Sequence, residues 1–178
     1  AATRARLAAE LSTARSELEH EVTSRRAELE NEITTRRAEL ESELETARTS
    51  LATELDAALQ DGAEAPVVLD IRGDAYADGH IEGAVSAPYG LFRGPADNPG
   101  QLPSEEELTE LLRDLGVSAD RPVVITHQGS DETDFGAAAR VYWTLKSSGV
   151  SNLAILNGGV GAWKAAGNAL STDTVEPE

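Results

Sequence analysis

An eleven-residue repeat fills the first third of the chain and constrains its fold more than any other feature. Residues 1–55 divide without a gap into the blocks AATRARLAAEL, STARSELEHEV, TSRRAELENEI, TTRRAELESEL and ETARTSLATEL. The seventh and eleventh positions of each block are aliphatic, and spacings of four and seven residues place them on one face of an α-helix. We call this row the seam. Its members are Leu7, Leu11, Leu18, Val22, Leu29, Ile33, Leu40, Leu44, Leu51 and Leu55.

Opposite charges flank the seam, because the fourth position of every block is Arg and the tenth is Glu. No Gly or Pro occurs in residues 1–60, so at about 1.5 Å per residue we expect one helix of about 85 Å. Eleven residues in three turns, about 3.67 per turn, favour a slight right-handed supercoil. We predict that residues 1–60 form a long hendecad helix, a coiled-coil or bundle stalk whose partner is a protein, through self-association or in a hetero-oligomer.

Two other interpretations of the repeat stay open. Eleven-residue repeats also resemble those of helices that lie on lipid surfaces, but such helices usually carry Lys-rich polar faces. This segment is net negative, so we do not expect direct membrane contact from it. The other interpretation is a single helix that is stabilised by its own ion pairs, such as Arg26 with Glu30 four residues later.

The charge of the whole chain excludes two classes of partner. The formal net charge is −17, and neither part of the chain offers a basic patch. Nucleic acid and anionic lipid would be repelled, so we expect neither as a partner. We find no apolar run of about 18 residues and no signal-peptide pattern. The chain also lacks Met, so we expect any targeting segment or membrane anchor to lie upstream of Ala1. The compartment stays open, and membrane association or export would require that segment.

The pattern changes after residue 60. All seven aromatic residues lie between Tyr76 and Trp163, and a short linker, residues 61–65, precedes a second domain, residues 66–172. Apolar segments typical of buried strands alternate with helical segments, which predicts a parallel sheet covered by helices. The predicted strands are 67–72, 123–126 and 153–156, and the predicted helices are 104–116 and 134–148, the first capped by Ser104. Residues 173–178 form an acidic tail that we expect to be disordered.

Two motifs in this domain resemble a known family. A strand ending in Asp70 and Arg72 is followed by the turn Gly79-His80-Ile81-Glu82-Gly83-Ala84, and Leu156-Asn157-Gly158-Gly159 precedes Ala162-Trp163. Over residues 64–172 they resemble the opening and closing motifs of the rhodanese (sulfurtransferase) family, which implies a three-layer α/β domain with a central parallel sheet. We expect structural roles for the motif residues: hydrogen bonds that join strand end to loop, a turn fixed by the imidazole, and glycines that allow close approach. These residues are Asp70, Arg72, His80, Gly83, Gly158, Gly159 and Trp163.

The resemblance also locates the loop where chemistry would occur. In an active family member the strand matching residues 123–126 runs into a Cys, whose thiolate is stabilised by inward-pointing N–H groups. This chain has no Cys, and His127 stands at that position. Imidazole cannot carry a transferable sulfur atom, and phosphatase chemistry on this fold needs the same thiolate. The degenerate loop comprises His127, Gln128, Gly129, Ser130, Asp131 and Thr133.

Other features of the loop agree with an inactive site. Asp131, Glu132 and Asp134 would repel thiosulfate or phosphate. We expect Thr133 or Asp134 to cap the following helix. A lengthened, Cys-free loop before a helix with Tyr142-Trp143 resembles the non-catalytic domain of tandem-domain sulfurtransferases.

Three alternatives stay open for the function. Ser130 lies near His127, as in a hydrolase, but no orienting acid or oxyanion hole is evident. The three carboxylates could bind a cation, although they lack the spacing of a calcium loop. We expect no catalytic residue, no metal and no cofactor, and predict a non-catalytic structural or interaction module displayed on an oligomerising stalk. The alternative is a sulfurtransferase component, of the thiosulfate or mercaptopyruvate type, whose Cys is absent from this chain or supplied by a partner.

Overall fold

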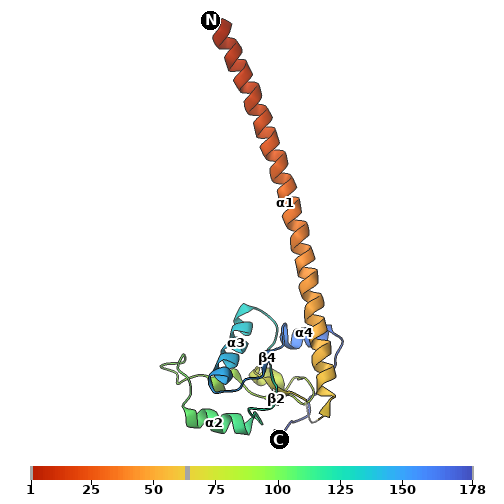
Figure 1. The fold of residues 1–178 in the computed structure, drawn as a ribbon, viewed down its shortest axis with the longest axis vertical. Coiled ribbons are helices and arrows are strands. Elements are labelled where there is room, and N and C mark those ends of the chain that lie inside the picture. The colour runs from red at the N-terminus through yellow and green to blue at the C-terminus, as the bar shows by residue number, and fades with distance from the viewer. Residues whose placement is uncertain (1, 63–64, 178) are drawn as a thin grey trace. The chain divides into compact units, whose positions relative to one another are not determined.

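The computed structural model describes residues 2–62 and 65–177. The chain divides into two compact units between Glu45 and Thr46. The first unit is helical and the second is a mixed α/β domain, and Figure 1 shows the order of the elements along the chain. Each unit is described by itself below.

Helix α1, Ala2–Leu59, is the predicted long N-terminal helix. Ion pairs recur along it, with 2.8 Å between Arg26 Nε and Glu30 Oε1 and 2.9 Å between Arg25 Nη1 and Glu28 Oε2. The seam side chains from Leu7 to Leu44 are 44–71% exposed, so the first unit leaves its apolar row uncovered. Within the described residues, no helix combines the length and the apolar character needed to cross a bilayer.

The α/β unit is built on a four-stranded parallel sheet. The strands are β1 Val67–Asp70, β2 Val85–Ser86, β3 Val123–Thr126 and β4 Leu153–Ile155. Their order is β2-β1-β3-β4, and Leu69 in β1 lies opposite Val85 on one side and Ile125 on the other. The three predicted strands are thus present, and β1 ends two residues earlier than expected.

Helices connect the strands. They are α2 Glu105–Asp114, α3 Glu132–Ser147 and α4 Gly159–Ala165, with 3-10 turns η2 Gly73–Tyr76 and η3 Tyr89–Phe92. Helix α2 begins as predicted: Ser104 Oγ accepts from Glu107 N, and Glu107 Oε2 accepts from Ser104 N. Helix α3 starts two residues before the predicted position, because Asp131 is its N-cap residue.

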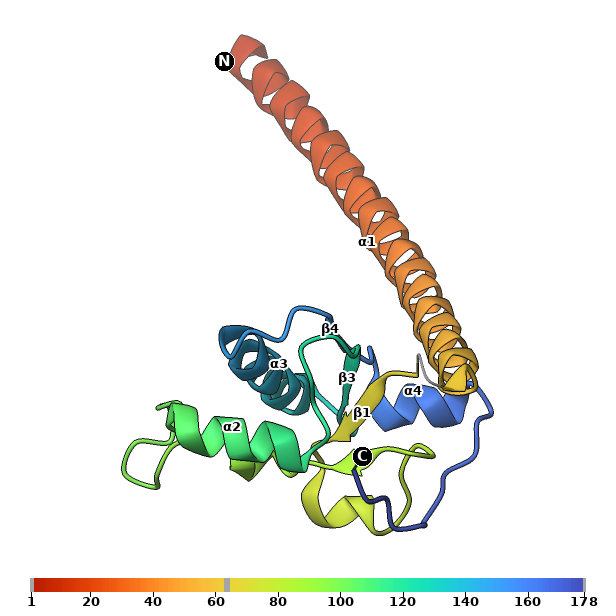
Figure 2. The same cartoon turned by 60° about the horizontal axis from the view of Figure 1, so that its bottom comes forward.

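Alternate side chains of the strands supply two hydrophobic clusters, one on each face of the sheet. Leu69 and Ile125 pack with Val141 of α3 in the first cluster, whereas Val68 packs with Trp163 of α4 in the second. Figure 2 shows α2 and α3 on one side of the sheet, and α4 with the last turns of α1 on the other. The domain therefore has the predicted three-layer arrangement.

The last turns of α1 belong to the α/β unit. Ala52 is 0% exposed and Leu55 7% exposed, and both join the cluster around Trp163. The eighth position of the repeat is Glu in the three middle blocks but Ala at residue 52. A carboxylate there would be buried without a partner, so Ala is what allows this turn to pack. The compact unit thus begins before residue 60, where the sequence places the domain boundary.

The C-terminal segment is held at two points. His80 and Ser171 form an antiparallel bridge, with 2.8 Å for each of their two backbone hydrogen bonds. Val175, within the tail that the sequence predicts to be disordered, packs against the first hydrophobic cluster. Of the predicted linker, residues 63–64 lie outside the described part of the chain.

We predict that Ala52→Glu destabilises the α/β unit, because it buries an unpaired carboxylate against Trp163. The expected loss in the free energy of unfolding is about 3 kcal/mol, measured by urea unfolding of the full chain. Ala8→Glu is the matched control, since it makes the same change at the same repeat position where the helix is exposed. Equal unfolding midpoints for the two variants would contradict this packing.

Candidate functional site

The carboxyl ends of three neighbouring strands bring the predicted site residues together. β1 ends at Asp70, β3 leads into His127, and β4 leads through Leu156 to Asn157 and Gly158. Side chains that follow parallel strands meet at one edge of the sheet, which is where ligands bind in open α/β sheets. The topology therefore places the degenerate loop between the two motifs.

Asp70 and Arg72 join several segments at this edge of the sheet. The Asp70 side chain is buried, and Arg72 Nη2 donates to its Oδ2 at 2.7 Å while Arg72 Nε donates to its Oδ1 at 3.0 Å. The same guanidinium donates to the Gly79 carbonyl at 2.7 Å and to Gln128 Oε1 at 3.2 Å. One buried ion pair therefore joins the strand end, the opening motif and the loop.

His80 packs within its own turn. Its ring stacks on Tyr76 with 3.8 Å between centroids, and its Nδ1 lies 3.1 Å from the Tyr76 carbonyl oxygen. The Tyr76 hydroxyl donates to the Ala84 carbonyl at 2.7 Å. Burial, together with the nearby charge of Asp70, raises the pKa of Tyr76, so this hydroxyl stays a hydrogen-bond donor at neutral pH.

The loop rests directly on the closing motif, backbone against backbone. The carbonyl of His127 accepts from Val160 N at 2.8 Å, and that of Gln128 accepts from Gly161 N at 3.1 Å. A Cβ at Gly159 would overlap the His127 carbonyl, and one at Gly129 would overlap the Gly158 carbonyl. Glycine is therefore needed at both positions for the backbone of the loop to approach the backbone of the closing motif. At Gly83, in contrast, no atom lies within 4 Å of an added Cβ.

The N–H groups of the loop converge on the carboxylate of Asp134. Gly129 N donates to Asp134 Oδ2 at 2.6 Å, Ser130 N donates to the same oxygen at 3.1 Å, and Gln128 N donates to Oδ1 at 3.2 Å. We call this set of three N–H groups the cradle. The carboxylate lies in the first turn of α3, so the protein supplies its own anion where such a loop would otherwise hold one.

His127 completes the cradle from one side. Its Nδ1 lies 2.7 Å from Asp134 Oδ2, and the residue is 2% exposed. A contact this short with a carboxylate oxygen requires a proton on Nδ1, so Nδ1 donates to Asp134 Oδ2. Among the described residues, Nε2 finds no hydrogen-bond partner.

The cradle favours the ionised form of Asp134. Partial burial raises the pKa of this carboxyl, but hydrogen bonds from His127 and from the N–H groups of Ser130, Gly129 and Gln128 outweigh that effect. The net result is a pKa of Asp134 below its ordinary value. The site therefore holds a fixed negative charge at neutral pH.

Asp131, and neither Thr133 nor Asp134, caps α3, so that prediction was wrong. Asp131 Oδ1 accepts from Thr133 N and Asp134 N, each at 2.9 Å. Asp134 is turned back to the loop and cannot cap. The loop offers several residues that suit a helix start, and only the contact between Asp134 and the loop decides among them.

These contacts also decide between the alternatives for the loop. Ser130 Oγ donates to Asp131 Oδ2 at 3.4 Å while His127 binds Asp134, so the serine and the imidazole do not form the pair that a hydrolase needs. The carboxylates of Asp131 and Asp134 are directed at N–H groups. Across residues 2–62 and 65–177, no group of three His, Asp or Glu is placed to hold a metal ion.

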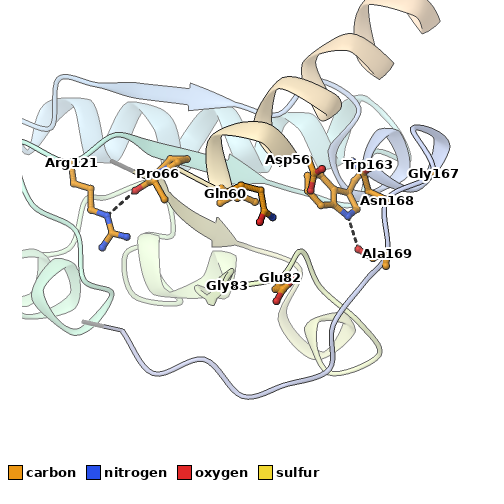
Figure 3. Close-up of a pocket in the computed structure, with 12 residues that line it drawn as sticks. Asp56, Gln60, Pro66, Glu82, Gly83, Arg121, Trp163, Gly167, Asn168 and Ala169 are labelled. Atoms are coloured by element: carbon orange, nitrogen blue, oxygen red, sulfur yellow. Dashed lines mark hydrogen bonds between the residues drawn. The ribbon is translucent and has the colours of Figure 1, made fainter. Parts of the chain in front are cut away.

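A separate cavity of about 550 Å³ lies at the other edge of the sheet, beneath the last turn of α1. Figure 3 shows Arg121 at one end of it and Trp163 with Asn168 at the other. Arg121 Nε donates to the Ala65 carbonyl at 3.0 Å, and Trp163 Nε1 donates to the Ala169 carbonyl at 2.8 Å. Of the predicted site residues only Gly83 and Trp163 line it, so it is distinct from the degenerate loop.

Comparison with known proteins agrees with this geometry. Residues 51–166 match the family model described as rhodanese-like domain. The chain belongs to the rhodanese-like domain family. The matched region begins inside α1, in keeping with the packing of its last turns on the α/β unit.

Relatives of this rhodanese-like domain are named as sulfurtransferases. The putative thiosulfate sulfurtransferase SseB of Mycobacterium tuberculosis is 34% identical over 110 residues, which cover 58% of this chain and 37% of that protein. The 3-mercaptopyruvate sulfurtransferase of Escherichia coli is 32% identical over 102 residues, which cover 57% and 35%. The chain thus spans about a third of the length of these relatives.

Solved structures support the rhodanese-like fold. The anaerobic ergothioneine biosynthesis enzyme from Chlorobium limicola, in complex with trimethyl histidine, superposes with a TM-score of 0.53 at 28% identity. The match covers 64% of this chain and 29% of that one. Unlike a family member that works through a thiolate, this rhodanese-like chain has no Cys.

The sequence analysis assigned other roles to two residues of the site. Asp134 was expected as a repulsive charge or a cap, yet it is the ligand of the cradle. Arg48 was assigned to the stalk repeat, yet it lines a cavity beside His127. Ala52, one turn later, stands where the three middle blocks carry Glu, but Ala8 holds the same position on an exposed face, so this difference alone could not identify Arg48.

Proposed function

We propose that this chain is a non-catalytic rhodanese-like module, a structural or interaction domain displayed on a helical stalk that associates with other chains. The observation that carries this proposal is the cradle: the N–H groups that would stabilise a thiolate are bound to Asp134. His127 adjoins that carboxylate and has no sulfur to transfer. Shape and surface are then the means by which the domain acts.

The chemistry of sulfur transfer supports the proposal. A thiolate attacks the outer sulfur of thiosulfate, the S–S bond breaks, sulfite leaves, and the thiolate becomes a persulfide that cyanide returns to the thiolate as thiocyanate is released. Each anionic stage needs donors around the sulfur. Here three N–H groups and an imidazole N–H are directed to a carboxylate, whose negative charge would repel the thiosulfate dianion.

The same contacts disfavour the alternative, a sulfurtransferase component that receives its Cys from a partner chain. A thiolate brought from outside would have to displace the Asp134 carboxylate from the cradle. It would also have to bind beside the side chains of Asp131 and Glu132. The names of the relatives indicate sulfur transfer for those proteins. Whether this chain transfers sulfur is the question that the following experiments address.

We predict that installing a thiol is insufficient to create the activity. In His127→Cys the neighbouring carboxylate should hold the thiol pKa above about 8.5. In His127→Cys with Asp134→Ala the vacated N–H groups should lower it by about one unit or more. The pH dependence of alkylation by iodoacetamide measures this pKa, and circular dichroism confirms folding.

Thiocyanate release from thiosulfate and cyanide is the accompanying assay. We expect none from the wild-type chain or from His127→Cys, and turnover only from the double variant. Turnover by the pure wild-type chain would end the non-catalytic interpretation. A low thiol pKa in the single variant would show that Asp134 does not block the cradle.

The exposed seam is the reason for proposing association through the stalk. Eight aliphatic side chains, each 44–71% exposed, recur along α1 between Leu7 and Leu44, and such apolar surface is normally covered. The adjacent arginines are paired within their own helix, as Arg37 is with Glu41 at 3.1 Å. Their aliphatic stems then extend the apolar row while their charges are compensated.

We predict that the full chain sediments as an oligomer at micromolar concentration and that Leu29→Asp weakens this association about 100-fold or more, because every copy loses a buried leucine. Sedimentation velocity measures both effects. Ala27→Asp adds the same charge two residues away on the opposite, polar face, and it should leave association unchanged. A monomeric wild-type chain, or equal effects of the two variants, would contradict the stalk proposal.

A further inference from the structure

The two sides of the seam carry their charges at different positions of the repeat. At about 3.67 residues per turn each residue advances by about 98°, so the third and fourth positions of a block lie on opposite sides of the seam. The eighth position lies beyond the fourth, and the tenth lies beyond the third. We call the side of the fourth and eighth positions the first flank, and the side of the third and tenth positions the second flank.

Both flanks alternate in charge along the three middle blocks of the repeat. The first flank carries Arg15, Glu19, Arg26, Glu30, Arg37 and Glu41. The second flank carries Glu21, Arg25, Glu32, Arg36 and Glu43. Any helix that covers the seam must therefore meet alternating charges on both sides of it.

The arginines of the first flank can bind a second carboxylate. Arg26 Nε donates to Glu30 Oε1 of its own helix at 2.8 Å, and the two side chains are 80% and 62% exposed. Arg15 and Arg37 also donate through Nε to the glutamate four residues later. A guanidinium has five N–H donors, so its terminal nitrogens can reach a carboxylate on another helix.

A parallel second copy would place like charges together. In a parallel pair, the first flank of one helix faces the second flank of the other at the same level. Arg26 would then lie beside Arg25 of the second copy, and Glu30 would lie near Glu32 of the second copy. Such like-charge contacts weaken association.

An antiparallel second copy places opposite charges together, because each flank then faces the same flank running in the opposite direction. We consider the alignment in which the two helices meet at the level of residue 28 of both copies. On the first flank it pairs Arg26 with Glu30, Arg15 with Glu41 and Arg37 with Glu19. On the second flank it pairs Arg25 with Glu32 and Arg36 with Glu21. Twofold symmetry repeats each of these pairs.

The same alignment matches the aliphatic residues of the seam. It places Leu29 beside Leu29 of the second copy, and it pairs Val22 with Ile33, Leu18 with Leu40 and Leu11 with Leu44. All of these residues belong to the first compact unit. The seam has only two aliphatic positions in three turns, which suits contact with one other helix. A single alignment thus covers the seam and compensates the charges of both flanks.

We infer that the seam binds a second copy of this chain, as an antiparallel pair of helices that meet at the level of residue 28. The inference rests on the proposed association through the stalk and names its partner and orientation. A different protein would have to reproduce both the aliphatic spacing and the charge order. The chain already supplies both.

Engineered disulfides test the orientation, because the chain has no Cys of its own. Val22→Cys and Ile33→Cys each add one thiol to the seam. In the antiparallel pair, two copies of the same variant hold their thiols about 15–18 Å apart along the axis. A disulfide needs Cα atoms about 4.4–6.8 Å apart. Residue 22 of one copy and residue 33 of the other lie side by side and can be linked.

The two full-chain variants are mixed under reducing conditions and then oxidised with glutathione disulfide. We expect the link between positions 22 and 33 as the main product, identified by peptide mass spectrometry, and little product from either variant alone. Ready linkage of each variant alone would indicate a parallel pair and overturn the inference. An oligomer that forms no link in the mixture would exclude this alignment. A monomeric wild-type chain would instead contradict the proposed function itself.

Charge reversal at the centre of the pair is an independent test. Arg26→Glu places a carboxylate opposite Glu30 of the second copy, so association should weaken about tenfold in sedimentation experiments. In a parallel pair the new carboxylate would face Arg25, and association should strengthen. Arg6→Glu is the matched control. It breaks a similar pair within the helix, with 2.9 Å between Arg6 Nε and Glu10 Oε1, but at the sixth position, outside both flanks. Equal effects of the two variants would contradict the pairing.

Discussion

The carboxylate of Asp134, held by three loop N–H groups and the imidazole of His127, is the interaction on which the rest of the site depends. It sets the start of α3, because a carboxylate turned back to the loop leaves Asp131 to cap the helix. It also binds Nδ1 of His127, while Nε2 of that ring finds no hydrogen-bond partner among the described residues. It also satisfies the donors that sulfur chemistry would require, which links the local geometry to the proposed loss of catalysis.

The two parts of the chain differ in whether their apolar side chains are buried. The α/β unit buries its apolar side chains on both faces of a four-stranded sheet, and the last turns of α1 complete one of those faces through Ala52 and Leu55. The repeats before Thr46 carry the same spacing but expose their seam. The fifth block differs from the middle three by an alanine at its eighth position, and this small side chain allows its helix face to pack on the α/β unit.

Much of the fold could be predicted from the sequence because its signals are local. The Ser104 cap with Glu107 three residues later fixed the start of α2, and short β-branched runs located the strands. For the motif residues Asp70 and Arg72, hydrogen bonds that join strand end to loop could be expected, but their mutual ion pair was not. The hydrogen bonds within the loop could not be predicted, because Asp131, Thr133 and Asp134 all suit the first position of a helix. The hydrogen bond from Gly129 N to Asp134 withdraws Asp134 from that role and leaves Asp131 as the cap. The role of Arg48 depends on a contact across more than a hundred residues of sequence, with Gly158.

Nuclear magnetic resonance titration of the full chain tests the occupied cradle most directly. We expect the Asp134 carboxyl carbon to titrate with a pKa below the ordinary value of about 3.9, and the amide protons of Gly129 and Ser130 to shift with the same midpoint, because they donate to that carboxylate. Protonation of Asp134 should weaken both bonds together. An Asp134 that titrates at its ordinary value, with loop amides that do not respond, would contradict the account.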